Sequence, residues 1–191
     1  MFGARDVWFV VGLPVFLYSA GWTFWEVGGF LAVWTIAYGV IQAIAPSLVR
    51  KSKDGLSCEV PAARLWGLVL AAVPAMLIGV LEFGDALPVS PQTIVVVGLT
   101  IFGLPFAVNS SLHSYLILAY AGSKKAAEDV GFYYAANAAG RLMGTLLSGA
   151  LYQAGGLTAC LLGSFIMLSV CSVLCVRMSL SRLLKLSPGS L

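Results

Sequence analysis

The chain has 191 residues, of which 60% are hydrophobic and only 10% are charged, and its formal net charge at pH 7 is +3. Because an ordinary soluble domain carries about 25% charged residues, this composition excludes a soluble globular protein. Apolar stretches long enough to cross a bilayer recur along the whole sequence, which predicts a membrane protein with several spans.

The apolar stretches predict an all-α protein with six transmembrane helices. We place them at residues 1–20, 27–45, 65–83, 93–120, 132–152 and 157–176, followed by a cytoplasmic tail at residues 177–191. The first span contains a charged pair, Arg5 and Asp6. Without that pair, the apolar run from Val7 to Ala20 has fourteen residues, too few to cross the membrane.

The fourth predicted span is too long for a helix that stands upright in a bilayer. Its twenty-eight residues give about 42 Å of helix, against a hydrocarbon core of about 30 Å. We therefore expect this helix to tilt, kink or project, with a break at Gly103 and Pro105. Spans three and six carry no charged residue over most of their length, so we expect them to face lipid.

Basic residues alternate between the two sides of the predicted bundle. They follow the second, fourth and sixth spans, at Arg50, Lys51, Lys53, Arg64, Lys124, Lys125, Arg177, Arg182 and Lys185, whereas the other three connections contain no Lys or Arg. The positive-inside rule then places both termini in the cytoplasm, in agreement with an even number of spans. We expect a multi-pass protein of the cell (inner) membrane, surrounded by lipid bilayer. The net charge is a topology signal and gives no indication of nucleic-acid binding.

Arg141 is the most informative residue because it lies halfway along an apolar stretch, Phe132–Tyr152, that contains no other charged side chain. An Arg at the centre of a membrane helix costs roughly 2.5–3.5 kcal/mol on insertion scales, so it is rarely kept without a partner or water. The planar guanidinium suits oxyanions, since it can donate two parallel hydrogen bonds. We interpret Arg141 as part of an anion path; the alternative is an interhelical clamp with a carboxylate, for which Asp6 is the candidate.

The stretch Phe132–Tyr152 has two distinct helix faces, one of small residues and one of polar residues. Gly140 and Gly144 form a GxxxG pair, which Ala136 and Ser148 extend, and small residues at this spacing favour close packing of a neighbouring helix. A polar stripe runs along a second face, formed by Asn137, Arg141, Thr145 and Ser148 between Tyr134 and Tyr152. We expect the stripe to line a water-filled cavity.

The fourth span carries a matching polar cluster that includes Asn109 and His113. Measured from the shared cytoplasmic loop, Asn109 lies about 16 Å deep and Arg141 about 14 Å, while His113 and Asn137 lie at about 10 and 8 Å. Four polar side chains therefore meet at the same level if both helices face one cavity. His113 is the only histidine; it is either a hydrogen-bonded structural imidazole, a ligand for an anion or a proton-coupling group.

No enzyme signature is present: the sequence lacks a nucleophile elbow, an HExxH motif, a phosphate loop and paired intramembrane carboxylates. We expect neither enzymatic activity nor a cofactor. One histidine without nearby carboxylates argues against a metal site. Cys171 and Cys175 lie one helical turn apart. They are either a thiol pair that binds a soft metal or small apolar residues that fill space in the bundle.

Three segments resemble a known family. GFYYAANAAGRLMGTLLSG (Gly131–Gly149) resembles the eleventh helix of ArsJ, the organoarsenical efflux permeases of the major facilitator superfamily. NSSLHSYLILAY (Asn109–Tyr120) resembles their tenth helix, and GARDVWFVVGLPVFL (Gly3–Leu17) their seventh. The likeness covers nearly the whole chain but only helices 7–12 of such a permease.

This resemblance implies export of 1-arsono-3-phosphoglycerate, an anion, which gives arsenate resistance. The site prediction comes from the physical properties of the residues: we expect Arg141 to bind the substrate anion, with Asn137, Asn109, His113 and Thr145 beside it. Asp6 pairs with Arg5 or Arg141, or these residues and His113 take part in proton coupling. Because such transporters work by rocking one half against the other, we expect an amino-terminal half or a second copy as partner. The alternatives are a facilitator for another anionic metabolite and a non-transporting helical module that assembles with another membrane protein.

Overall fold

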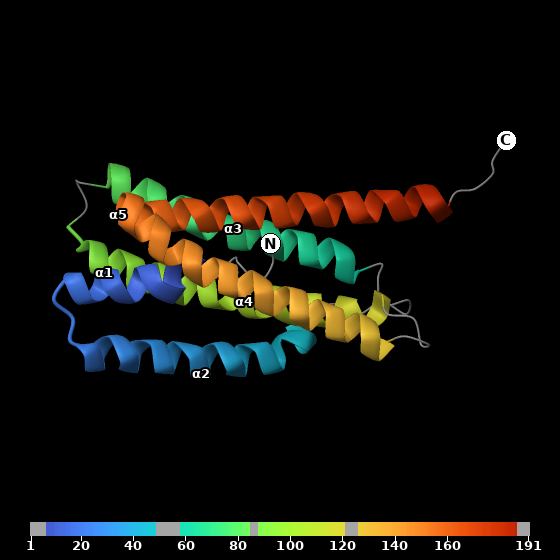
Figure 1. Cartoon of the computed structure of the whole chain (residues 1–191), viewed down its shortest axis with the longest axis horizontal. Coiled ribbons are helices and arrows are strands. Elements are labelled where there is room, and N and C mark those ends of the chain that lie inside the picture. The colour runs from blue at the N-terminus through green and yellow to red at the C-terminus, as the bar shows by residue number, and fades with distance from the viewer. Residues whose placement is uncertain (1–6, 49–57, 85–87, 121–125, 187–191) are drawn as a thin grey trace.

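The computed structural model describes residues 7–48, 58–84, 88–120 and 126–186. These residues are helical almost throughout, and no strand occurs among them, so the predicted all-α class is confirmed (Figure 1). In chain order the elements are the π-helix η2 (Trp8–Gly12) and the α-helices α1 (Leu13–Ser19), α2 (Phe24–Leu48), α3 (Glu59–Phe83), α4 (Pro91–Tyr120) and α5 (Ala126–Leu186). Their axes lie roughly along one direction, as in a bundle (Figure 1).

Within the described ranges, four helices are long and apolar enough to cross a membrane: Phe24–Ser47, Glu59–Phe83, Pro91–Ala119 and Ala127–Leu174. Their length and composition indicate a membrane-embedded protein. The predicted count of six spans is not confirmed. Only the short apolar helix Trp8–Ser19 represents the first span, and the fifth and sixth spans form one element, α5.

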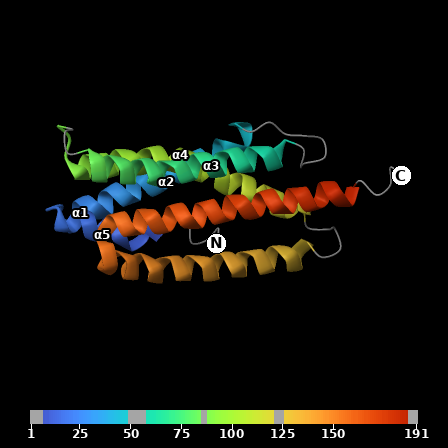
Figure 2. The same ribbon diagram turned by 90° about the horizontal axis from the view of Figure 1, so that it is seen from above.

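The long element α5 is a helical hairpin that reverses direction at two glycines. Gly155 has φ −160° and ψ 27°, and Gly156 has φ 63° and ψ −154°, a backbone region that is essentially restricted to glycine. Both views show the chain turning back on itself at this point (Figures 1 and 2). We call residues 126–154 the first arm and residues 157–186 the second arm. The second arm continues ten residues past the predicted end of span six, into the segment predicted as a tail.

Local hydrogen bonds fix where two of the helices begin. At the start of α2, the Thr23 backbone N–H and hydroxyl donate to Glu26 Oε2 over 2.7 and 2.8 Å, and the Glu26 N–H donates to Thr23 Oγ1 over 3.3 Å, which is a capping box. At the start of α4, the Thr93 N–H donates to Ser90 Oγ over 3.3 Å, and Pro91 occupies the first helical position, where its missing N–H is harmless.

The core is an aromatic cluster that joins η2, α2 and α4. Trp8 is fully buried and meets Phe102 edge to face, with ring centroids 5.5 Å apart. Trp34 of α2 donates its Nε1–H to the Leu99 carbonyl of α4 over 2.9 Å. A Cβ added at Gly103 would lie 3.2 Å from Trp34 Nε1, so the glycine admits the indole against α4.

The predicted break at Gly103 and Pro105 does not interrupt α4, which is helical from Pro91 to Tyr120. The absence of a side chain at Gly103 is used for packing against Trp34, and Pro105 is buried within the continuous helix. The expectation that span three faces lipid holds for only part of the surface of α3. One face of α3 is buried between α4 and α5, and the least covered of the four long helices is α2.

Candidate functional site

The first arm of α5 has one packed face and one open face, and Arg141 lies on the open one. Gly140, Gly144 and Ser148 are buried, so these three residues form a packing face as predicted, whereas Ala136, which was expected to extend that face, is exposed. Arg141 and Thr145 are exposed. The arm runs along one edge of the bundle, which places its open face on the outer surface (Figure 2).

Ser148 belongs to the packed face, although the helical spacing also allowed it in the polar stripe. Its Oγ accepts hydrogen bonds from the backbone N–H groups of Val11, over 3.2 Å, and Gly12, over 3.0 Å. The Cys160 thiol of the second arm donates to the Ser148 carbonyl over 3.3 Å. A Cβ at Gly12 would lie only 2.9 Å from Cys160 Sγ. The π-helix η2 is therefore held tightly between the two arms of α5.

The rest of the polar stripe is available at the surface. Thr145 donates its hydroxyl to the Arg141 carbonyl over 3.0 Å, which leaves the Thr145 oxygen free to accept. Asn137 is half-buried, one turn before Arg141. Among the described residues no carboxylate forms an ion pair with Arg141. Asp6, the predicted clamp partner, and Arg5 lie outside the described residues.

Asn109 and His113 lie in a different place from Arg141. They line a small cavity between α3, α4 and the second arm, together with Ala63, Arg64, Gly67, Leu168, Cys171 and Ser172. We call it the polar cavity after its polar lining residues, although most of its open wall is apolar. Neither Arg141 nor Asn137 lines it. The predicted depths matched the four polar residues by level along the helix axes, but depth carries no information on the direction in which a side chain leaves the helix. The structure thus forms two polar regions where one was expected.

Within the polar cavity, His113 is bonded to its own helix. Its Nδ1 lies 2.9 Å from the Asn109 carbonyl oxygen. Since a carbonyl oxygen can only accept, this bond holds a proton on Nδ1 and makes Nε2 the acceptor of the neutral ring. Asn109 is buried, with 2% of its surface exposed.

Arg64 is the functional candidate that the sequence did not reveal. The sequence predicts a position in the cytoplasmic connection before span three, whereas Arg64 lies within α3 and lines the polar cavity. The small residues Ala63 and Gly67, four apart on the same helix and both buried, were the available signal of a packed face beside it. Glu59, at the start of α3, is also buried and accepts a hydrogen bond from the Cys58 N–H over 3.3 Å.

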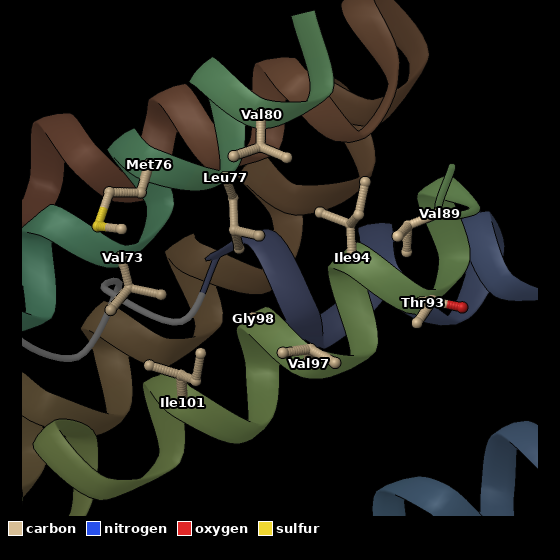
Figure 3. Close-up of a pocket in the computed structure, with 10 residues that line it drawn as sticks. All are labelled: Val73, Met76, Leu77, Val80, Val89, Thr93, Ile94, Val97, Gly98 and Ile101. Carbon is tan, nitrogen blue, oxygen red and sulfur yellow. The ribbon is translucent and has the colours of Figure 1, made fainter. Parts of the chain in front are cut away.

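A second hollow is an apolar groove of about 280 Å³ between α3 and α4. The side chains that point into it come from both helices and from Val89, and Thr93 is the one polar residue among them (Figure 3). The helices approach closely there because a Cβ at Gly98 would overlap the Leu77 side chain. An anion has no counter-charge in this groove, so it is not a candidate for the anion path.

The described residues contain no group of three or more His, Cys, Asp or Glu side chains placed to hold a metal ion. Cys171 is half-buried beside the polar cavity, and the side chain of Cys175 is outside the described part of the structure. No family model, curated protein or solved structure matches the chain. Functional interpretation therefore depends on the residues themselves.

Proposed function

We propose that this chain is one half-bundle of a membrane efflux transporter that exports an anionic organoarsenical such as 1-arsono-3-phosphoglycerate. The observation that carries the proposal is the position of Arg141. It is exposed on the outer surface of the bundle, halfway along an apolar arm, and pairs with no described carboxylate. A guanidinium facing hydrocarbon at this depth is strongly unfavourable, so the proposal requires a second body to cover the open face and to enclose water there.

The chemistry of the open face favours a solute with oxyanion groups. Arg141 supplies a permanent positive charge and paired N–H donors, and the exposed Thr145 hydroxyl oxygen lies one turn away. Asn137, half-buried on the same arm, adds amide donors. Asn109 and His113 line a separate cavity and are not part of the Arg141 site in this proposal.

The identity of the solute rests on the sequence resemblance to the ArsJ permeases. The proposed six-span arrangement rests on the apolar runs, and the proposed cytoplasmic location of both termini rests on the distribution of basic residues. The proposed second body is a separately encoded amino-terminal half or a second copy of this chain. Its role is to supply the opposite wall of the anion path and the movement that opens the path to each side.

A second candidate is a non-transporting module that assembles with another membrane protein. The same observation supports it, because an exposed arginine on a packed helix can pair with a carboxylate of a partner. In that case the charge is required for assembly, and a substitution at Arg141 removes the protein from the membrane together with its partner.

The test uses cells that lack their own arsenate efflux and that express the chain alone or with a candidate amino-terminal half. Export of the organoarsenical and the amount of inserted protein are measured for the wild type, Arg141→Lys, Arg141→Gln and a control, Leu142→Gln, which adds an amide at the adjacent exposed position. We expect Arg141→Gln to abolish export at normal protein levels and Leu142→Gln to retain it. Full export by Arg141→Gln would refute the anion path, and loss of the protein itself would favour the assembly module.

A further inference from the structure

We propose that the apolar groove between α3 and α4 is a binding site for one acyl chain of a membrane phospholipid. The groove has a volume of about 280 Å³, and the residues that line it come from these two helices and from Val89 (Figure 3). No described residue of α2 or α5 lines it, so it is separate from Arg141 and from the face assigned to a second body. The inference therefore does not depend on the proposed export.

The groove has a floor of buried residues and two walls of exposed residues. Leu77 of α3 and Gly98 of α4 form the floor, where the helices lie so close that a Cβ at Gly98 would overlap the Leu77 side chain. Met76 on α3 and Val97 and Ile101 on α4 form the walls, and each leaves half or more of its surface uncovered. Because residues four apart lie on one face of a helix, the walls follow the helix axes and the groove is elongated.

The walls are stiff, so the side chains do not close the groove. Seven of the ten residues that line it are β-branched: Val73, Val80, Val89, Thr93, Ile94, Val97 and Ile101. Within a helix, Val and Ile have one strongly preferred χ1 rotamer, and they cannot swing across the floor. Met76 is the flexible side chain of the walls and can adjust to a bound chain. An empty groove would leave its lining atoms without contact partners, which is unfavourable.

The surroundings of the groove determine what fills it. Water needs several polar partners, and Thr93 is the one polar residue of the lining. The exposed surfaces of membrane-embedded helices are in contact with hydrocarbon chains. A chain in the groove contacts the floor and both walls, whereas a chain on a convex helix surface is contacted from one side. Since hydrocarbon gains nothing from leaving other hydrocarbon, this additional packing is what retains the chain.

The length of the groove and its polar end indicate how the chain enters. From Thr93 to Ile101 the groove follows eight residues of α4, which is about 12 Å of helix, against about 15 Å for one leaflet of the hydrocarbon core. Thr93 lies in the first turn of α4, and its Oγ1 is 2.9 Å from Ser90 Oγ. The polar end therefore lies at the end of the helix, where lipid headgroups are located, and the apolar remainder extends toward the bilayer centre. This geometry fits one chain of a lipid in the leaflet at that end.

Photolabelling in vesicles tests the proposal. The full chain is reconstituted into phosphatidylcholine vesicles that contain a small fraction of phosphatidylcholine with a photoreactive diazirine in the middle of one acyl chain, and labelled residues are mapped by mass spectrometry. Ile101 is compared with Val33 of α2, which lies at a similar distance from the same end of the bundle (Figure 1). The two side chains are 58% and 68% exposed, so ordinary contact with lipid labels them about equally.

We expect severalfold more label at Ile101 than at Val33 in the wild type. Val97→Phe extends a ring from the wall over the groove and should reduce the label at Ile101 to the level of Val33. The control Ile36→Phe, at an exposed position of α2 outside the groove, should leave the label at Ile101 unchanged. Thr93→Trp, which blocks the polar end, is the second variant if Val97→Phe does not fold, and it should have the same effect.

The other occupants of such a groove give different results. Equal label at Ile101 and Val33 in the wild type, or undiminished label at Ile101 in both groove variants, would show an ordinary lipid-facing surface and overturn the proposal. A second copy of the chain seated on the groove would bring the two Val97 positions together. We expect Val97→Cys to remain monomeric when membranes are oxidised; a disulfide-linked dimer that the wild type, with its four native cysteines, does not form would also overturn the proposal.

Discussion

Replacing Ser148 by Ala tests whether one hydroxyl fixes the π-helix η2 between the arms of α5. Ser148 is fully buried, and its Oγ accepts from two backbone N–H groups, those of Val11 and Gly12. The substitution leaves both donors without this acceptor in an interior that water does not reach. An orphaned buried donor costs about 1–3 kcal/mol in soluble proteins, whereas polar contacts between membrane helices average about 0.6 kcal/mol. For two donors we therefore expect a loss of about 1–3 kcal/mol in the free energy of unfolding.

The measurement is reversible unfolding of the protein in mixed micelles or bicelles, followed by the fluorescence of its five tryptophans, which include the buried Trp8 of η2. The matched control is Ser47→Ala, since the exposed Ser47 hydroxyl bonds only to the Ile44 carbonyl of its own helix over 2.7 Å. We expect the control to stay within about 0.5 kcal/mol of the wild type. If Ser148→Ala is no less stable than Ser47→Ala, the hydroxyl does not fix η2 and the reasoning is wrong.

Three further substitutions probe the joints of the bundle by the same unfolding measurement. Gly156→Ala forces a side chain into φ 63°, ψ −154° and should lower the free energy of unfolding by about 1–3 kcal/mol. The control Gly149→Ala, at a helical glycine with open space around it, should be neutral or slightly stabilising. Equal effects of the two substitutions would contradict the backbone argument. Gly98→Ala places a Cβ on the Leu77 side chain and should cost about 1–3 kcal/mol. The double variant with Leu77→Ala should regain part of that loss, and a purely additive result would speak against contact. Thr23→Ala removes the capping box of α2 and should lower the free energy of unfolding by about 0.5–2 kcal/mol. Unchanged hydrogen exchange in the first turn of α2 would show that the capping box does not stabilise this end of the helix.

The positions of the helices followed from simple properties of the sequence. Apolar runs and their polar boundaries placed α2, α3 and α4 to within a few residues at most ends, because hydrophobic length and capping act locally. Gly140 and Gly144 predicted a packing face for the same reason, since their spacing alone brings them together on one side of a helix. Among these three helices, the largest error in bounds was the start of α3, where Arg64 suggested a loop although the helix begins at Glu59.

The candidate site was harder to predict because it depends on rotation about helix axes and on contacts between distant segments. Asn109 and Arg141 have matching depths, yet Asn109 lines a cavity with α3 and the second arm while Arg141 is exposed. The π-helix η2 was equally hidden, since it is stabilised by Ser148, more than a hundred residues away in the sequence. Neither feature leaves a periodic pattern that a single sequence could display.

The two-glycine reversal in α5 has a mechanical consequence. The two arms are joined at Gly155 and Gly156 without a longer loop. The arms therefore cannot slide independently along their axes, because these two residues are too short a connection to absorb a displacement. Any axial step of the arm that carries Arg141 must be transmitted to the arm that carries Ser172. Such a step would therefore also shift Leu168 and Ser172 relative to Asn109, with which they line one cavity, so the hairpin couples the two polar regions mechanically.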